Sequence, residues 1–313
     1  IEDDLQNLIE FSSDHFVLGA DFNSAEEKKR LYLKVTDQGE KQGVIDEKKV
    51  SRLSVTQKML SVAFLSADII RIFQESASFR RRDLDRFCSD FDETYKGALR
   101  RYDKLIKQKN AVLKQDPPGD IQLWNQQIIP LAETVYTVRQ AALESLAEQL
   151  DQLCKTHGFL TYDALTIDYE LKGNHNPNGI DEQYGVWLEH TLQNYGEKER
   201  LAGHSLIGPH RDDFKIMIDG KPLDRFFSRG INRIFAVLLK WSQMMLIQSK
   251  LGLKPVLLLD DTFAEIDGNM KLKLRDVLQG NAQIFYTTVL EEDRDLFEDA
   301  TWFKVSKGSV THA

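Results

Sequence analysis

The spacing of apolar residues changes twice along the chain and divides it into three segments. Over 15–22 and 30–36, apolar or β-forming residues alternate with polar ones, which predicts strands in a β-rich first segment, residues 1–66. Between about 67 and 156, apolar residues recur every three or four positions, the period of a helix buried on one side. From 157 onward, short apolar runs alternate with helical stretches, which is typical of an α/β sheet.

The middle segment predicts two long amphipathic helices joined by a break. Their apolar stripes cover 95–113 and 124–153, and Asp-Pro-Pro-Gly-Asp at 116–120 separates them because proline cannot continue a helix. Pro130 is expected to kink the second helix or to mark its start. The simplest fold is one α/β head into which an antiparallel helical arm is inserted.

Composition limits the classes to which the chain can belong. Its 313 residues are 42% hydrophobic and 29% charged, so disordered and collagen-like chains are excluded. The net charge of −8 excludes a uniformly basic nucleic-acid binder but not a basic patch. Two cysteines, Cys88 and Cys154, cannot form a disulfide framework, which favours a reducing, cytoplasmic setting. Every apolar run is far shorter than the ~20 residues that cross a membrane, so no membrane partner is expected.

The strongest local signal is Pro-Val-Leu-Leu-Leu-Asp-Asp at 255–261. The apolar run predicts a buried strand, and the two carboxylates stand at its C-terminal end, where ligands bind in open α/β sheets. In nucleotide hydrolases this is the Walker B pattern. The first acid, here Asp260, supports Mg²⁺, and the second, here Asp261, orients or deprotonates the attacking water. The alternative interpretation is a strand followed by a polar turn.

Two further signals flank this strand. Phe-Ser-Arg-Gly-Ile-Asn-Arg at 227–233 opens a long helical pattern, and Ser228 with the free N–H groups of that helix would form an anion site. Gly230 would let a phosphate approach the backbone closely. Ala-Glu-Ile-Asp at 264–267 places Asp267 on a turn that a partner's nucleotide could meet. The alternatives are an ordinary serine-capped helix and a pair of solvated acids.

The order and spacing of these three segments resemble the second half of an ABC-type ATPase, and in particular the RecF family of bacterial recombination-mediator ATPases. Further similar stretches cover nearly the whole chain. They are Gly-Pro-His-Arg-Asp-Asp at 208–213, Phe-Arg-Arg-Arg-Asp-Leu-Asp at 79–85, residues 101–114, Leu-Trp-Asn at 123–125 and a closing hairpin at 304–310. Two departures are Ile231-Asn232, where many relatives carry glutamine, and Thr287-Thr288 in place of the ABC switch histidine.

The resemblance implies an α/β, ABC/SMC-like ATPase head with an inserted antiparallel helical arm. Its parts would be the N-terminal part of the head (1–77), the arm (78–160) and the C-terminal part of the head with signature motif, Walker B and D-loop (161–313). Asp260 and Asp261 would be catalytic, and Asp260 would also hold Mg²⁺. The residues that would contact ATP held by the opposite subunit are Ser228, Arg229, Gly230 and Arg233, with Asp267 in the D-loop.

The resemblance also implies a function. Proteins of this family bind ATP, dimerise head to head around it, and bind gapped or junction DNA as well as duplex. With RecO and RecR they help to load the recombinase in DNA repair, replication restart and the SOS response. Their ATPase is slow and serves as a dimerisation switch, so a weak ATPase is expected of the full-length dimer. The sequence does not assign roles to His210 and Arg211.

The chain contains no G-x-x-x-x-G-K-[ST] motif, because its one Gly-Lys pair, at 220–221, is followed by proline. It also begins with Ile1 and not with methionine. RecF proteins carry the P-loop close to the N-terminus. We therefore expect a natural segment with the P-loop to precede Ile1, and residues 1–313 alone not to hydrolyse ATP.

Charge is distributed unevenly along the chain. Residues 71–114 carry twelve Lys/Arg and seven Asp/Glu, whereas 255–313 carry six and eleven. The cations that would contact DNA are Arg80, Arg81 and Arg82 at the base of the arm and a basic stripe, Arg100, Lys104 and Lys107, along its first helix. Such a stripe could neutralise DNA phosphates without reading sequence. The alternative is a solvated helix face.

Two other functions stay open on the sequence alone. One is a different SMC-like ATPase whose arm binds a protein, which charge reversal on the basic stripe would distinguish. The other is a degenerate SMC-like head that acts as a non-enzymatic scaffold or protein-interaction module. A P-loop encoded upstream of Ile1 would exclude the scaffold.

Overall fold

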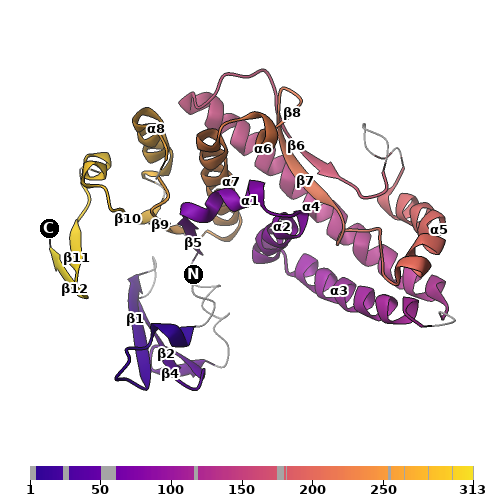
Figure 1. The fold of residues 1–313 in the computed structure, drawn as a ribbon, viewed down its shortest axis with the longest axis horizontal. Coiled ribbons are helices and arrows are strands. Elements are labelled where there is room, and N and C mark those ends of the chain that lie inside the picture. The colour runs from indigo at the N-terminus through magenta and orange to yellow at the C-terminus, as the bar shows by residue number, and fades with distance from the viewer. Residues whose placement is uncertain are drawn as a thin grey trace. The chain divides into compact units, whose positions relative to one another are not determined.

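The computed structural model describes residues 5–23, 28–50, 61–115, 119–174, 180, 182–252, 255–263, 265–280, 282–297 and 299–312 (Figure 1). The chain divides into two compact units, residues 1–62 and 63–313. The three-part organisation by function, with boundaries at 77 and 160, stays a prediction.

The first unit is an antiparallel sheet with the strand order β1-β2-β3-β4, preceded by the short 3-10 helix η1 (Leu5–Leu8). The strands are β1 (His15–Asn23), β2 (Lys28–Thr36), β3 (Lys41–Ile45) and β4 (Lys48–Val50). The strands predicted at 15–22 and 30–36 pair with each other along their whole length. The connection between β2 and β3 is short, because β2 ends at Thr36 and β3 already begins at Lys41.

The second unit contains a three-stranded sheet with β9 (Pro255–Asp260) between β5 (Ser61–Ser66) and β10 (Gln283–Thr287). β10 runs parallel to β9, as expected for strands separated by a helix. That helix is α8 (Gly268–Leu278), and the long α7 (Arg229–Leu251) precedes β9. Leu257 and Leu259 of β9 are fully buried in one hydrophobic core with residues of both helices. The predicted Walker B strand is therefore a central strand.

The helical segment begins with η3 (Ala67–Ile70), α1 (Arg71–Gln74) and α2 (Ala77–Phe91). It continues with α3 (Glu93–Leu113) and α4 (Ile121–His157), which run antiparallel and side by side (Figure 1). This helical hairpin is called the arm below. Pro130 lies inside α4, so it does not mark the start of that helix. Residues 116–118 of the predicted break lie outside the described residues.

Several of the remaining elements pack on the arm. A second antiparallel sheet, β6-β7-β8, packs on α4, and α5 follows β6 in the chain. A hairpin of two strands, which the sequence predicted, ends the chain. These elements are β6 (Leu165–Glu170), α5 (Tyr184–Ala202), β7 (Asp213–Ile218), β8 (Lys221–Pro222), α6 (Leu223–Phe226), η4 (Glu291–Leu296), β11 (Phe303–Ser306) and β12 (Ser309–His312). Within the described residues, no helix combines the length and apolar character needed to cross a bilayer.

A buried ion pair joins the outer part of the arm to α5. The Nζ of Lys109 on α3 lies 2.7 Å from Oε2 of Glu199 on α5, and the two side chains are 0% and 1% exposed. The backbone N–H of Leu206 donates to the other carboxylate oxygen at 2.8 Å. Burial lowers the pKa of Lys109, and the neighbouring Glu199 charge opposes this shift. Because both charges lose their hydration, the pair fixes the position of α5 more than it adds stability.

Lys109→Met should lower the free energy of unfolding by about 3–5 kcal/mol, because it leaves a carboxylate buried without its counter-charge. Adding Glu199→Gln should recover most of this stability, since the uncharged amide oxygen can still accept from Leu206. Urea unfolding of the wild type and both variants at pH 7 measures the difference. A double variant no more stable than Lys109→Met would show that the pair is not what holds α5 on the arm.

Candidate functional site

The N-terminus of α7 presents free backbone N–H groups beside an exposed serine. Ser228 is the N-cap, with φ −63° and ψ 160°, and its Oγ accepts a hydrogen bond from the N–H of Ile231 at 3.3 Å. Arg229, the first residue of the helix, is also exposed, and Gly230 is half-buried. The first N–H groups of a helix lack intrahelical acceptors, and the helix dipole favours an anion there. This end of α7 can therefore hold an anionic group.

Two side chains buried behind this turn hold it in place. The Nδ2 of Asn232 donates to the carbonyls of Phe227 and Ser228, each at 3.0 Å. Arg233 is only 4% exposed, and its Nη2 lies 3.3 Å from Oε2 of Glu265, in the loop between β9 and α8. Arg233 thus faces a carboxylate of its own chain, and its contact with ATP stays a prediction.

Asp260 ends β9 and is exposed at the C-terminal edge of the sheet. The parallel register of β9 and β10 places Thr287 opposite Asp260. The Oγ1 of Thr287 donates a 2.5 Å hydrogen bond to Oδ1 of Asp260. The carboxylate is thus oriented by a neighbouring strand end. Thr288, the other residue at the position of the switch histidine, instead donates to the buried Asp293 at 2.7 Å.

The chain turns sharply directly after β9. Asp261 has φ 49°, in the left-handed region, and its backbone N–H donates to the carbonyl of Thr287 at 3.1 Å. Non-glycine residues in this conformation are strained and cluster at functional sites. Thr262 is fully buried, and its hydroxyl donates to the carbonyl of Leu65 on β5 at 2.7 Å. The two carboxylates are therefore presented on an anchored turn.

The loop from β9 to α8 reaches the N-terminus of α7. Glu265 has φ 64°, and its carbonyl oxygen lies 3.8 Å from the place that a Cβ would take on Gly230. Asp267 is the N-cap of α8 and accepts from the N–H of Met270 at 3.1 Å. Ala264, part of the predicted acidic turn, lies outside the described residues. The end of α7 and the loop that begins with the Asp pair are thus neighbours within one chain.

The Asp pair has the donor chemistry that Mg²⁺ uses with nucleotides. Among the described residues, no three His, Cys, Asp or Glu side chains gather as metal ligands. Mg²⁺ is commonly held by only one or two carboxylates, with phosphate and water oxygens completing the octahedron. Asp260 and Asp261 are hard oxygen donors that follow each other at one edge of the sheet. They fit a magnesium ion that arrives with phosphates.

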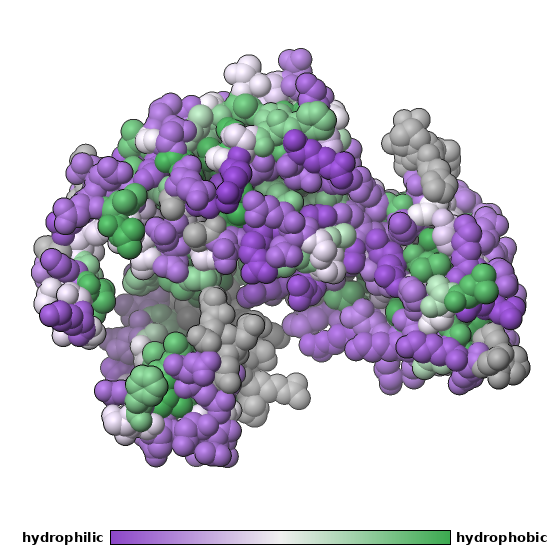
Figure 2. Space-filling model, viewed as in Figure 1, coloured by the Kyte–Doolittle hydropathy of each residue, from purple (hydrophilic) through white to green (hydrophobic). Residues whose placement is uncertain are grey.

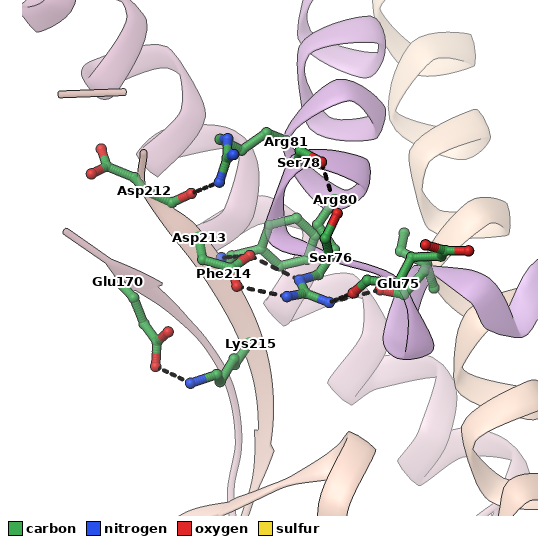
Figure 3. A network of polar contacts seen from close by, with 11 residues as sticks. Glu75, Ser76, Ser78, Arg80, Arg81, Glu170, Asp212, Asp213, Phe214 and Lys215 are labelled. Atoms are coloured by element: carbon green, nitrogen blue, oxygen red, sulfur yellow. Dashed lines mark hydrogen bonds and ion pairs between the residues drawn. The ribbon is translucent and has the colours of Figure 1, made fainter. Parts of the chain in front are cut away.

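The three arginines at the base of the arm have different surroundings (Figure 3). Arg80 forms a two-pronged ion pair with Asp213, at 2.8 and 2.7 Å, and is 14% exposed. Arg81 donates to the carbonyl of Asp212 at 2.6 Å. Arg82 is exposed, with its guanidinium 5.8 Å from the centre of the Phe79 ring. Arg80 and Arg81 thus have partners inside the chain, and their DNA contacts stay predictions.

The basic stripe lies on α3, as its spacing predicted. Arg100, Lys104 and Lys107 are all exposed, and Asp103 is an exposed acid beside them. Figure 2 shows that the visible face of α3 is a continuous band of hydrophilic residues. In the described part of the chain, none of the three cations forms an ion pair with another residue. The stripe is therefore available to a polyanion.

The segment Gly-Pro-His-Arg-Asp-Asp at 208–213 is a largely buried loop held by polar contacts. Gly208 has φ 122°, and a Cβ there would stand 2.6 Å from the hydroxyl oxygen of Tyr102, so only glycine fits. The Tyr102 hydroxyl is also 2.6 Å from Nδ1 of His210. Arg211 donates twice to the carbonyl of Ser205, at 3.0 and 2.8 Å. His210 and Arg211 therefore hold a loop, and neither faces the Asp pair through these contacts.

Burial shifts two pKa values of this segment in opposite ways. Desolvation lowers the pKa of His210 to about 3, helped by the nearby positive charge of Arg211. Desolvation raises the pKa of Asp212 to about 7, although the backbone N–H of Lys172 donates to its carboxylate at 2.9 Å. Both groups are therefore favoured in their uncharged forms, as expected when a charge leaves water.

Sequence comparison identifies relatives along nearly the whole chain. No protein-family model matches it. The DNA replication and repair protein RecF of Staphylococcus epidermidis is 29% identical over 323 aligned positions, which cover 97% of this chain and 84% of that protein. The RecF of Citrifermentans bemidjiense is 28% identical, with 97% and 83% covered. The chain is a homologue of the RecF proteins.

Solved structures confirm the predicted fold. The recombination mediator protein RecF-ATPrS in the RecFOR pathway matches this RecF homologue with a TM-score of 0.79 at 24% identity, over 98% of this chain and 83% of that one. An Smc head domain with an extended coiled coil from Pyrococcus furiosus matches with a TM-score of 0.52 at 11% identity. The expected α/β, ABC/SMC-like head with an inserted antiparallel helical arm is therefore the fold of this chain.

Sequence reasoning missed a buried arginine at the centre of the arm of the RecF homologue. Arg139 of α4 is 1% exposed and donates to Asp85, Tyr169 and the carbonyl of Pro209, the last at 2.7 Å. A signal was present, because Arg139 falls within the apolar stripe of its helix, four residues after the buried Val135. A charged residue at a core position predicts a buried partner.

The folded state binds fewer protons at His210 than the unfolded state between about pH 3 and 6.5, so acid favours unfolding through this group. His210→Gln should remove this effect because glutamine does not titrate. Its amide oxygen can still accept from Tyr102, which preserves the local contact. Relative to the variant, the wild type should lose about 1.4 kcal/mol of unfolding free energy for each pH unit below about 6.5. Urea unfolding at pH 7, 6 and 5 tests this. Asp212 titrates with the opposite sign in both proteins, so only their difference is informative, and parallel pH profiles would contradict the assignment.

Proposed function

We propose that this RecF homologue is an ATP-dependent DNA-binding protein of DNA replication and recombinational repair. Two facts support the proposal: its relatives are named DNA replication and repair proteins, and its structural neighbours are RecF proteins named with ATP or ATPrS. One structural observation gives this proposal its strongest support. The free end of α7, with Ser228 and Gly230, adjoins the loop that begins with Asp260 and Asp261.

In this proposal the N-terminus of α7 receives the phosphates of an ATP molecule that a second copy of the protein holds. Ser228 and Arg229 are exposed, as a contact across a dimer requires. Gly230 adds no side chain where a phosphate would approach the backbone. Asp267 caps a helix whose N-terminus follows the same loop. ATP would then join two heads and act as the dimerisation switch.

The Asp pair supplies the remaining chemistry. Asp260, oriented by the Thr287 hydroxyl, would hold Mg²⁺, which neutralises phosphate charge when it is bound. Asp261, on its strained turn, would orient the attacking water or accept its proton. We expect a weak ATPase from the full-length dimer, because the site is then completed by two copies.

The DNA partner in this proposal is gapped or junction DNA and duplex, held through the basic stripe on α3. Phosphate contacts of this kind position a protein without reading sequence. RecO and RecR are proposed as protein partners in the loading of a recombinase, and the cytoplasm as the site of action. A non-enzymatic scaffold with the same fold would need neither ATP nor the charges of the stripe.

Ser228→Arg in the full-length natural protein should abolish ATP-induced dimerisation, because it puts bulk where the partner's phosphate would sit. Binding of ATP to the variant's own subunit should stay nearly intact, and removal of the cap should cost only about 1 kcal/mol of stability. Asp261→Asn should instead keep dimerisation and slow hydrolysis, since it removes only the charge that acts on water. Sedimentation with and without ATP separates these results. A Ser228→Arg protein that still dimerises with ATP would refute the composite site.

Replacing Arg100, Lys104 and Lys107 together by glutamate should weaken DNA binding to a similar extent for all sequences. The logarithmic salt slope should fall by about 0.9 for each phosphate that is no longer neutralised, because fewer counterions are released. Fluorescence anisotropy with labelled duplex at several salt concentrations measures both effects. Glutamate at Lys198, Lys304 and Lys307, which are also exposed, is the control of matched charge. Equal effects of both triple variants would show that the stripe is only a solvated helix face and not a DNA contact.

A further inference from the structure

Helix α2 contacts the strand that leads to the N-terminus of α7. The guanidinium of Arg80 grips both carboxylate oxygens of Asp213, the first residue of β7, and also donates to the carbonyl of Glu75 at 2.8 Å (Figure 3). Arg81, at the next position, donates to the backbone carbonyl of the residue that precedes the strand. Ser228 follows only ten residues after the end of β7. The position of β7 is therefore set from α2.

The same helix also contacts α7 directly, through Asp83. The ammonium of Lys240 forms an ion pair with one carboxylate oxygen, and the amide Nε2 of Gln243 donates to the other oxygen at 3.0 Å. Gln243 is 6% exposed, and the Asp83 side chain 15%. Lys240 stands twelve residues after Ser228 on one unbroken helix, about 18 Å along its axis. Asp83 therefore fixes the position of α7, and the anion-binding N-terminus of this unbroken helix moves with it.

A third contact of α2 reaches the arm, through Asp85. Its Oδ1 accepts from Nε and Nη2 of Arg139 on α4, at 3.0 and 2.7 Å, and from the hydroxyl of Tyr95 on α3. Only Asp92, the N-cap of α3, separates α2 from the helix that carries the basic stripe. Helix α2 thus contacts both the helix that carries the stripe and the helix whose N-terminus is the anion site.

These three contacts are charged, largely buried and formed by several hydrogen bonds each. Apolar contacts tolerate small sliding, whereas a buried charge must keep its partners at hydrogen-bond distance. A displacement of α3 and α4 by a ligand would thus be passed to α2, and from α2 to α7, or else leave buried charges unpaired. Such contacts hold relative positions in the way that a coupling between two sites requires.

We propose that α2 couples the DNA-binding arm to the nucleotide-binding end of α7, and that Asp83 is the positioning residue through which this coupling passes. The inference rests on the proposed function, because it takes DNA on the stripe and ATP at Ser228 as the two ligands. Asp83 touches neither ligand in this proposal. It makes the affinity for DNA depend on bound nucleotide and, by thermodynamic reciprocity, the affinity for nucleotide depend on bound DNA to the same factor.

The test measures that factor in the full-length natural protein. The dissociation constant of a fluorescent duplex is measured with and without a non-hydrolysable ATP analogue, and that of the analogue with and without duplex. For the wild type we expect the same ratio from both directions, in the range of about 5- to 150-fold. Asp83→Asn should bring both ratios to within twofold of one, while each ligand alone keeps its wild-type affinity within about twofold. Asp83→Glu, which keeps the charge, should restore part of the ratio.

Two controls separate coupling from damage to the fold. Asp163→Asn makes the same change at an exposed position outside α2 and α7 and should keep the wild-type ratio. Lys240→Met should act like Asp83→Asn, and the double variant should be no worse than either single one, since all three remove one ion pair. Wild-type ratios in Asp83→Asn, or a ratio of one in a wild-type protein that binds both ligands, would overturn this inference alone. A wild type that binds neither duplex nor analogue would overturn the proposed function and the inference together.

Discussion

The arm and the second sheet are organised around one buried positive charge. Arg139 is 1% exposed, so hydrogen bonds within the protein have to replace the hydration of its guanidinium. Its acceptors come from distant parts of the chain: Asp85 on α2, Tyr169 on β6 and the carbonyl of Pro209 before β7. They can surround it only when α2, α4 and both strands take their native places. A hydrophobic core would tolerate several arrangements of these elements, whereas this charge tolerates few.

A second constraint, the parallel register of β9 and β10, builds the candidate site. It places Thr287 beside Asp260, so that a neutral hydroxyl orients the carboxylate and leaves its negative charge uncompensated. The left-handed backbone of Asp261 then turns the chain toward the N-terminus of α7. Helix α7 is contacted by both parts of the structure. Helix α2 contacts its middle, and the β9–α8 loop adjoins its first turn. The polar contacts of the arm and the geometry of the site thus act on one element.

The sequence predicted what depends on local pattern and missed what depends on tertiary partners. The strand of 255–261 was predictable because its apolar run ends abruptly in two acids, and α7 because Ser228 precedes a long helical stripe. The start of α4 was not, since Pro130 is tolerated inside a helix whose buried residues extend from Ile128 to Cys154. Nor could periodicity show that Arg233 faces Glu265, because only the left-handed loop brings that carboxylate back to α7. Buried charges such as Arg139 are visible in a sequence as misplaced residues, but their partners are not.

The internal ion pairs also decide how the charge of residues 71–114 should be interpreted. Of the twelve cations in this segment, Arg80, Arg81 and Lys109 are held by groups inside the fold. Of its seven acids, Asp83 and Asp85 are held in the same way by Lys240 and Arg139, so nine cations and five acids remain. The segment therefore stays basic after its structural charges are set aside. Because Arg80 and Arg81 at the base point inward, the attraction for a polyanion moves outward along the arm, to the exposed face of α3.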